Sequence, residues 1–523
     1  MEEAARVAID LGAESCRVSL LRWNGARTGS QRTASGPWGN GPSIEVIHRI
    51  QNAPVHISKN EGPSSGAPVH RGDALVWPLK QILAGLEEGL RKAAAAAPEG
   101  IASIGVDGWS VDYVRLAADG TMLREPFCYR DERTVAAKEA ADWTVPPFDL
   151  YQRTGTLPHR INTVYQLMAD STPSPDGKSK GIEKRAPWVM FPEFILYWLS
   201  GMRVAEYTNA THTGLVNLKT GAWDAELFEL LGLDLGAAPP IVPTGTVLGP
   251  VVGPLRGLDA FRDTQMIAPA THDTASAIAG IPADLGSSAY ISSGTWSLVG
   301  TVTQTPVTTK HAFDAGYTNI GAACEGMLFH SLINSMWVLK QCMDGWAAEG
   351  RPWSIENLVQ EAAACNAAAT GVLDMDAEAL MLDSEMPRRI NTELARRGFE
   401  AIADVAGNEP IFARTIFESL ALRYASATAN LEKMLGRRLE RVAMIGGATR
   451  NKLLVDLTEQ RTGLKVEIGE TESSTVGNLA VQLAASEANG GVVTAAAVRE
   501  WSTRLCERLG VGNRGQGTEG ATR

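Results

Sequence analysis

The amino-acid sequence predicts an α/β protein with two domains, and three observations support this prediction. The chain has 523 residues, which is more than one hydrophobic core usually supports. Short apolar segments typical of strands alternate with segments whose apolar residues recur at helical spacing. Polar residues directly follow several strand-like segments, where open α/β sheets bind their ligands. We therefore expect ligand-binding residues at the strand ends.

The first predicted elements are a hairpin, a helix and a strand. Residues 6–9 and 17–23 are apolar runs separated by Asp10-Leu11-Gly12 and a polar stretch, which is typical of two strands joined by a tight turn. A helix is predicted over residues 79–92 from five apolar residues at helical spacing: Leu79, Ile82, Leu83, Leu86 and Leu90. A strand at 101–106 follows and leads into the polar segment 107–112.

A second set of elements resembles the first. Residues 266–269 lead into a polar segment at 271–276, and residues 289–292 lead into another at 293–297. A helix is predicted over residues 416–431, followed by a strand at 442–445 and then by Gly446-Gly447. Residues 171–187, rich in Ser, Pro, Gly and Lys, are expected to form a surface loop. Both halves of the chain look alike, which indicates a duplicated domain.

Composition and charge exclude several classes of function. The net charge is −11 and no run of five like charges occurs, so nucleic acid is not an expected partner. Neither a signal segment nor a stretch of about 20 apolar residues is present, so we expect a cytoplasmic protein without a membrane partner. The six cysteines form no C-x-x-C pair and the eight histidines are scattered, which indicates reduced thiols and no transition-metal site.

Asp10 is the first candidate for phosphate chemistry. A carboxylate at a strand end, followed closely by Gly12, can hold Mg²⁺ through water while backbone amides approach phosphoryl oxygens. Taken alone, the same residues are more simply explained as an ordinary turn. Asp10 alone does not decide between these interpretations.

A series of motifs in a fixed order carries a resemblance to a known family. They are residues 10–17 (DLGAESCR), 104–113 (IGVDGWSVDY), 129–131 (YRD), 151–155 (YQRTG), 162–167 (NTVYQL), 206–211 (EYTNAT), 271–277 (THDTASA), 292–297 (SSGTWS), 416–422 (IFESLAL), 445–451 (IGGATRN) and 474–478 (STVGN). In this order the chain resembles the FGGY family of carbohydrate kinases, which includes glycerol, xylulose and rhamnulose kinases. The resemblance is strongest to the rhamnulokinases and covers residues 6 to about 485.

The resemblance implies a fold and an activity. The fold would be two actin-like ATPase (ribonuclease H-like) α/β domains flanking a deep cleft: residues 1–262 with the sugar side and first phosphate loop, residues 263–505 with the catalytic base and adenosine site, and a disordered tail at 506–523. The activity would be phosphorylation of a ketose by ATP and Mg²⁺ at its primary hydroxyl, L-rhamnulose first. A kinase for another sugar such as L-fuculose, and an inactive sugar-sensing protein, are the alternatives. A monomer or small homo-oligomer is expected.

The resemblance also implies roles for individual residues on the sugar side. Asp273 would be the general base, although a helix N-cap is the structural alternative. His272, Thr274, Ser110 and Asn334 would contact the sugar, and Ser110 replaces a Gly that is usual in rhamnulokinases. Residues 157–160 also depart from the family pattern, and Arg160 there is either an unexpected cation in the site or a solvated surface residue.

On the nucleotide side, the resemblance implies two phosphate loops and an adenosine platform. Gly447 would form the platform, Thr295 the second loop, Gln341 would bind nucleotide, and Asp10 would hold the metal. The first loop would be Ala13, Glu14, Ser15, Cys16 and Arg17. Glu14 and Cys16 replace smaller residues of the family, and Ala448 replaces a Gly.

Two motifs are set aside. Residues 510–515 spell G-x-G-x-x-G, but they open no helix after a strand and so do not predict a dinucleotide site. Residues 209–211 spell an N-glycosylation acceptor that a cytoplasmic chain would not use.

Overall fold

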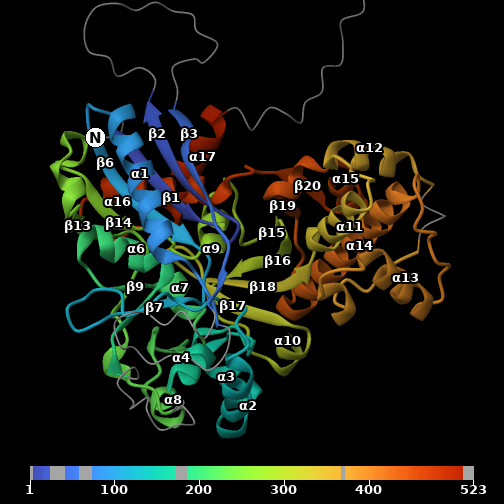
Figure 1. The fold of residues 1–523 in the computed structure, drawn as a ribbon, viewed down its shortest axis with the longest axis horizontal. Helices are drawn as coiled ribbons and strands as arrows, with labels where there is room; N and C mark the ends of the chain where they lie inside the picture. The colour runs from blue at the N-terminus through green and yellow to red at the C-terminus, as the bar shows by residue number, and fades with distance from the viewer. Residues whose placement is uncertain (1–3, 24–41, 58–73, 172–184, 367–370, 510–523) are drawn as a thin grey trace, which may run out of the picture.

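The computed structural model describes residues 4–23, 42–57, 74–171, 185–366 and 371–509 (Figure 1). Most of the predicted surface loop at 171–187 lies outside these residues. Two six-stranded sheets organise the chain, and each is the centre of one half of the molecule. All six cysteines are free, as predicted. Within the described ranges, no helix is both long and apolar enough to cross a bilayer.

The first sheet has the strand order β13-β14-β6-β1-β2-β3. β1, β2 and β3 are antiparallel neighbours, whereas β6 and β14 run parallel to β1. The predicted hairpin at 6–23 is therefore present. The bounds are β1 (Ala5–Leu11), β2 (Ser15–Trp23), β3 (Pro42–Gln51), β6 (Ile101–Gly108), β13 (Thr246–Pro250) and β14 (Gln265–Ala268).

Helix α1 (Leu79–Ala96) covers one face of this sheet. Its apolar residues recur at helical spacing, so Leu79, Ile82, Leu86 and Leu90 all face the core and are buried. The predicted helix at 79–92 is confirmed and extends four residues further. α6 (Phe191–Ser200) joins the same core through Phe191, Phe194 and Ile195.

The second sheet has the order β17-β18-β16-β15-β19-β20. β15, β16, β18 and β17 are successive antiparallel neighbours, and β19 and β20 continue parallel to β15. The bounds are β15 (Ala289–Ser293), β16 (Trp296–Thr303), β17 (Tyr317–Gly321), β18 (Met327–Asn334), β19 (Arg441–Ile445) and β20 (Lys465–Ile468).

The two sheets repeat one pairing scheme. In five strands of each sheet, an antiparallel hairpin is extended by a further antiparallel strand on one side and by two parallel strands on the other. The sixth strand differs, because β13 lies antiparallel beside β14 whereas β17 lies antiparallel beside β18. β1 thus corresponds to β15, and β14 corresponds to β20. The predicted duplication is present, but the segment at 266–269 was assigned to the wrong copy: residues 265–268 form β14, the last parallel strand of the first sheet.

Two helices from the C-terminal part of the described chain, α16 (Ser473–Ala488) and α17 (Ala495–Leu509), pack against the first sheet. Helix α9 (Asp273–Ala279) packs beside them. Leu479, Val481 and Trp501 share one buried cluster with Ala8 of β1 and Ile267 of β14. α17 continues to Leu509 and Cys506 is buried, so the tail predicted from residue 506 begins too early. The division at residue 262 stays a prediction, and β14 lies just beyond it.

The remaining elements complete the two halves. The first half contains four two-stranded ribbons, from β4 (Val55–Ile57) with β5 (Ala74–Val76), β7 (Tyr113–Arg115) with β8 (Trp188–Met190), β9 (Ala205–Glu206) with β12 (Ile241–Val242), and β10 (Val216–Asn217) with β11 (Ala222–Trp223). Its other helices are α2 (Thr134–Thr144), α3 (Pro147–Thr154), α4 (Thr163–Ser171), α7 (Tyr207–Thr211) and α8 (Ala225–Leu230). The second half adds α10 (Lys310–Asp314), α11 (Met336–Ala348), α12 (Ile355–Ala364), α13 (Met386–Arg396), α14 (Glu409–Leu435) and α15 (Lys452–Thr462).

Candidate functional site

Polar residues from three segments meet at the carboxyl edge of the first sheet. Asp10 of β1 lies opposite Asp107 of β6 in the parallel register. Gly108 pairs with His272, and its N–H donates to the carbonyl of Thr271 at 2.9 Å. Parallel strands bring their carboxyl ends to one edge, so the predicted metal ligand Asp10 and the predicted base Asp273 share that edge.

Asp273 begins helix α9 and lies beside His272. Its Oδ1 accepts a hydrogen bond from the Thr274 N–H at 2.5 Å and lies 3.6 Å from His272 Nε2. The side chain is 38% exposed, so a substrate hydroxyl can reach it. The remaining part of the carboxyl is shielded from water by the protein, and this desolvation, followed by the charge of Asp10, raises the pKa of Asp273 to about 7. This places the group near the pKa that suits a general base at neutral pH.

Two buried glutamates hold the segment before Asp273. Thr271 donates from its hydroxyl to Glu193 at 2.7 Å and from its backbone N–H to Glu206 at 3.0 Å. Thr208 and Thr244 also donate to Glu206. Burial raises the pKa of Glu193 to about 7 and also raises that of Glu206. The 206–211 motif therefore supports the 271–274 segment, a role that its sequence did not reveal.

The predicted first phosphate loop, residues 13–17, spans the end of the turn between β1 and β2 and the first residues of β2. The N–H of Gly12 donates to the carbonyl of Ser15, and Glu14 is exposed to solvent. Cys16 lies in the core, where burial raises its pKa to about 12. Of the two residues that depart from the family pattern, Glu14 is thus exposed and Cys16 packs into the core. Ala13, which precedes Glu14 in the chain, is half-buried.

Arg17 connects this hairpin to the start of α16. Its guanidinium donates to Asp10 Oδ2 at 2.7 Å and also pairs with Glu472. Ser474 donates to the same Asp10 oxygen at 2.6 Å. Glu472 and Ser474 were not predicted as site residues, although the 474–478 motif was recognised. Their contacts with Asp10 and Arg17 join segments more than 450 residues apart, which sequence spacing alone does not reveal.

Asp107 is a further carboxylate that sequence analysis missed. It is fully buried, and its Oδ2 accepts from Asn478 at 2.6 Å. Its Oδ1 is buried without a hydrogen-bond partner among the described residues. Burial and the charge of Asp10 raise the pKa of Asp107 well above its ordinary value. Burial beside a second carboxyl thus disfavours the charged form of Asp107.

The predicted second phosphate loop and the predicted adenosine platform lie at the ends of β15 and β19. Thr295 lies in the turn between β15 and β16, and its carbonyl accepts from the Trp337 N–H. Gly446 has φ +90°, and a Cβ there would lie 2.5 Å from the Ser293 carbonyl oxygen, so glycine is required. Gly447 is exposed and open, whereas the Ala448 methyl group packs into the core. Ala448 therefore does not obstruct the Gly447 surface.

Asn334 and Gln341 contact a different segment. Asn334 pairs with Trp296 in the sheet, beside the second phosphate loop, and its side-chain amide donates to the Leu380 carbonyl at 2.8 Å. Gln341 accepts from the N–H of Ser384 at 3.3 Å. Both side chains are thus engaged with residues 380–384. Their predicted roles toward sugar and nucleotide stay predictions.

The loop that carries Ser110 follows β6 and is held in an unusual conformation. Val111 has φ +70°, which is rare for a β-branched residue. Its carbonyl accepts hydrogen bonds from Thr163 at 2.7 Å and Gln166 at 3.2 Å. Asp112 accepts from Gln166, Trp77 and Trp109. These contacts fix the strained turn, and they give the 162–167 motif a structural role.

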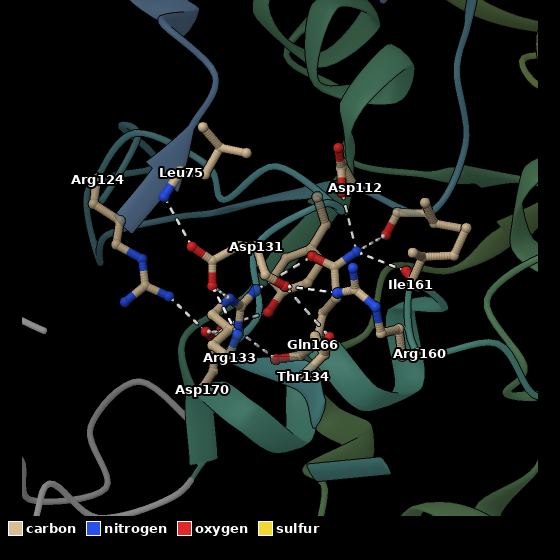
Figure 2. Close-up of polar contacts among 12 residues, drawn as sticks. Leu75, Asp112, Arg124, Asp131, Arg133, Thr134, Arg160, Ile161, Gln166 and Asp170 are labelled. Carbon is tan, nitrogen blue, oxygen red and sulfur yellow. Dashed lines mark hydrogen bonds and ion pairs between the residues drawn. The ribbon is translucent and has the colours of Figure 1, made fainter. Parts of the chain in front are cut away.

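Figure 2 shows the polar contacts around Gln166. Its side-chain amide donates to Asp112 and to the Ile161 carbonyl, while Arg133 donates to its oxygen. Arg133 and Arg124 also pair with Asp170. Arg160 is half-buried and donates to the carbonyl of Asp131 at 3.2 Å. Arg160 is therefore attached to this network and is not a fully solvated surface residue.

The carboxylates at the strand edge fit a hard cation that is shared with substrate phosphates. In the described part of the chain, no group of three or more His, Cys, Asp or Glu is arranged to hold a metal by itself. Magnesium usually takes one or two carboxylates together with phosphate oxygens and water. Asp10 provides such a carboxylate, and the buried, unpartnered Oδ1 of Asp107 lies on the neighbouring strand. The donor set thus suits a divalent cation bound together with ATP.

Solved structures define the class of fold. The gluconate kinase of Lactobacillus acidophilus covers 98% of this chain and 99% of its own, with TM-score 0.70 and 17% identity. Plasmodium falciparum glycerol kinase with ADP covers 96% of this chain and 93% of its own, with TM-score 0.70 and 13% identity. The chain therefore has the two-domain, actin-like fold of these sugar kinases.

Sequence comparisons define the family. The model of the FGGY family N-terminal domain matches residues 67–280, and that of the C-terminal domain matches residues 289–486. The rhamnulokinase of Bacteroides thetaiotaomicron is 31% identical over 91% of this chain and 89% of its own length. That of Pectobacterium atrosepticum is 32% identical over 95% and 90%. The chain belongs to the FGGY family of carbohydrate kinases and is an enzyme that phosphorylates a sugar with ATP.

Proposed function

We propose that this kinase transfers the γ-phosphoryl group of ATP to the primary hydroxyl of a ketose, with L-rhamnulose as the first substrate to test. The rhamnulokinase relatives support this choice because they match nearly the full length of the chain. The observation that carries the chemistry is the Asp273 carboxyl, which is accessible, lies next to His272 and has a pKa raised to about 7.

Asp273 acts as the general base in this proposal. The sugar oxygen attacks the γ-phosphorus, the bond from that phosphorus to the β–γ bridging oxygen breaks, and ADP leaves. The hydroxyl proton passes to Asp273. Because phosphoryl transfer has a loose transition state, Asp273 orients the hydroxyl first and accepts its proton late. Thr274 fixes the carboxylate for this task through its N–H and its hydroxyl.

The other predicted residues bind the two substrates. His272, Thr274 and Ser110 contact the sugar, while the 13–17 loop and Thr295 contact the phosphates, and Gly447 supports the adenosine. Asp10 would hold Mg²⁺, which when bound would supply positive charge to balance the phosphate oxygens. Arg17 orients Asp10 through its 2.7 Å ion pair. The two glutamates behind Thr271 hold the base in place.

Ser110 favours a second candidate within the same class. A side chain stands here where rhamnulokinases usually have Gly, so the pocket has a different shape at this point. A related ketose such as L-fuculose is therefore the alternative substrate. The inactive, sugar-sensing alternative receives less support because two of the departures that motivate it, Cys16 and Ala448, lie in the core.

The test measures ADP release by the purified protein with Mg-ATP against a panel of ketoses and polyols. We expect one ketose to stimulate turnover, and Asp273→Ala to lower kcat by about 10²- to 10⁴-fold, the usual contribution of a general base. Asp259→Ala, which changes an exposed aspartate of the same half, serves as the matched control. Sugar binding without sugar-dependent ADP release would instead support the sensing protein.

A further inference from the structure

Ser110 is hydrogen-bonded to a histidine that no motif singled out. Its Oγ lies 2.5 Å from Nδ1 of His212, and the two residues are 102 positions apart in the chain. Ser110 itself is buried in the loop that follows β6. The contact therefore joins this loop to the end of α7, for which His212 is the C-cap residue.

His212 also packs against the segment that carries the base. The His212 and His272 rings are 4.8 Å apart with their planes inclined by 33°. His272 in turn places Nε2 3.6 Å from the Asp273 carboxylate. Ser110, His212, His272 and Asp273 thus form a continuous series of contacts. The series begins at the loop expected to touch the sugar and ends at the base.

One atom in this series indicates that a ligand completes the site. His272 is buried, and its Nδ1 has no hydrogen-bond partner in the part of the chain that the structure describes. A buried polar nitrogen without a partner is costly and is usually satisfied by water or ligand. A polyol supplies hydroxyl groups that can donate or accept at this position.

His212 acts here as a neutral group. Burial, and then the neighbouring His159, lower the pKa of His212 to about 4. His272 and His330, which also face this region, have lowered pKa values for the same main reason. The uncharged ring has one donor and one acceptor nitrogen. Its effect on a sugar therefore comes from shape and directed hydrogen bonding rather than from charge.

We propose that Ser110 and His212 form one specificity-determining unit, which selects among ketoses that differ in the configuration of a single hydroxyl. The hydrogen bond holds the Ser110 side chain in place in the loop after β6. The contact between the two rings holds the orientation of the His272 ring. A sugar whose hydroxyl clashes with this unit, or leaves its polar atoms unpaired, binds poorly. This inference rests on the proposed function, because it assumes a ketose next to Asp273.

The test measures dissociation constants by titration calorimetry for L-rhamnulose and L-fuculose, which differ in configuration at one carbon. Binding is measured without ATP, so the result does not depend on turnover. The variants are Ser110→Gly, His212→Ala, His212→Asn and the double variant Ser110→Gly/His212→Ala. His311→Ala, an exposed histidine of α10, is the matched control. Thermal melting of each variant confirms folding.

We expect the ratio of the two dissociation constants to fall by about tenfold in each single variant, with no further fall in the double variant because the residues act together. His212→Asn, which keeps a hydrogen-bonding group, should retain part of the selectivity. Should His212→Ala fail to fold, Ser110→Gly and His212→Asn still measure the ratio.

Three results would overturn the inference: a ratio near one in the unmodified protein, a ratio unchanged by Ser110→Gly, or two single effects that simply add. Failure of the proposed function is distinguishable from these results. It would appear as selective sugar binding that responds to the variants but is never accompanied by ADP release.

Discussion

Asp273 combines access to solvent with a raised pKa, and this combination predicts a pH dependence. A base must be ionised, so kcat/KM should rise about tenfold per pH unit below pH 7 and level off above it, because the Asp273 pKa is about 7. The measurement is the initial rate of ADP release at low sugar concentration between pH 5.5 and 8.5. A profile flat across this range would show that Asp273 is not the group that titrates.

The same raised pKa affects stability in a defined direction. The folded protein binds the Asp273 proton more tightly than the unfolded chain does. The stability contributed by protonation is therefore present at low pH and is lost as the pH rises through about 7. Removing the carboxyl should thus leave the melting temperature at pH 8 unchanged or raised, which separates a catalytic loss from misfolding in the Asp273→Ala variant.

Val111 carries backbone strain that a glycine would relieve. A β-branched residue at φ +70° is strained by about 1–3 kcal/mol, whereas glycine adopts this conformation freely. Val111→Gly should therefore cost at least about 1 kcal/mol less stability than Val114→Gly, which truncates an equally buried valine of β7 without relieving strain. Urea unfolding of both variants tests this comparison, and equal costs would contradict it.

At the scale of elements, helix α4 holds the loop that carries Ser110 through Gln166. Gln166→Leu removes the donor to the Val111 carbonyl and to Asp112. Asp112 is buried, and burial raises its pKa to about 6. Loss of a hydrogen-bond donor to this buried carboxyl should therefore cost about 1–3 kcal/mol of stability. It should also raise the KM for sugar more than the KM for ATP.

Gln152→Leu provides a matched control for this prediction, because Gln152 is an exposed glutamine of the neighbouring helix α3. The measurements are steady-state kinetics with each substrate varied in turn and urea unfolding. Equal increases in both KM values would indicate a general loss of structure. They would contradict a specific role for Gln166 in holding the loop that carries Ser110.

Helices and hairpins that follow from the spacing of apolar residues within one segment were predictable from sequence. The sheet that a strand joins, and the contacts between distant segments, were not predictable. The β1–β2 hairpin and α1 followed from apolar spacing, and the order of motifs indicated the family. β14 was placed in the wrong copy because a four-residue apolar strand contains no information about which sheet it joins. The Ser110–His212 contact escaped prediction for a related reason: it depends on two segments meeting only in the folded chain.

At the scale of the whole molecule, the last helix stabilises the first sheet. Trp501 of α17 is buried in the cluster that contains Ala8 and Ile267. Trp501→Ala should lower the free energy of unfolding by about 3–5 kcal/mol. Trp143→Ala, which truncates a tryptophan that is 90% exposed, should change it by less than about 0.5 kcal/mol. Chemical denaturation compares the two, and similar costs would contradict the role of α17.

The return of α16 and α17 to the first sheet has a consequence during synthesis on the ribosome. The strands of that sheet are complete once residue 268 has been made, yet the helices that cover Ala8 and Ile267 end at residue 509. At roughly 5–20 residues per second, the nascent chain exposes this apolar surface for about 12–48 s. A kinase built in this way needs protection from aggregation while its second half is being translated, and release from a chaperone is expected only after its C-terminal helices emerge.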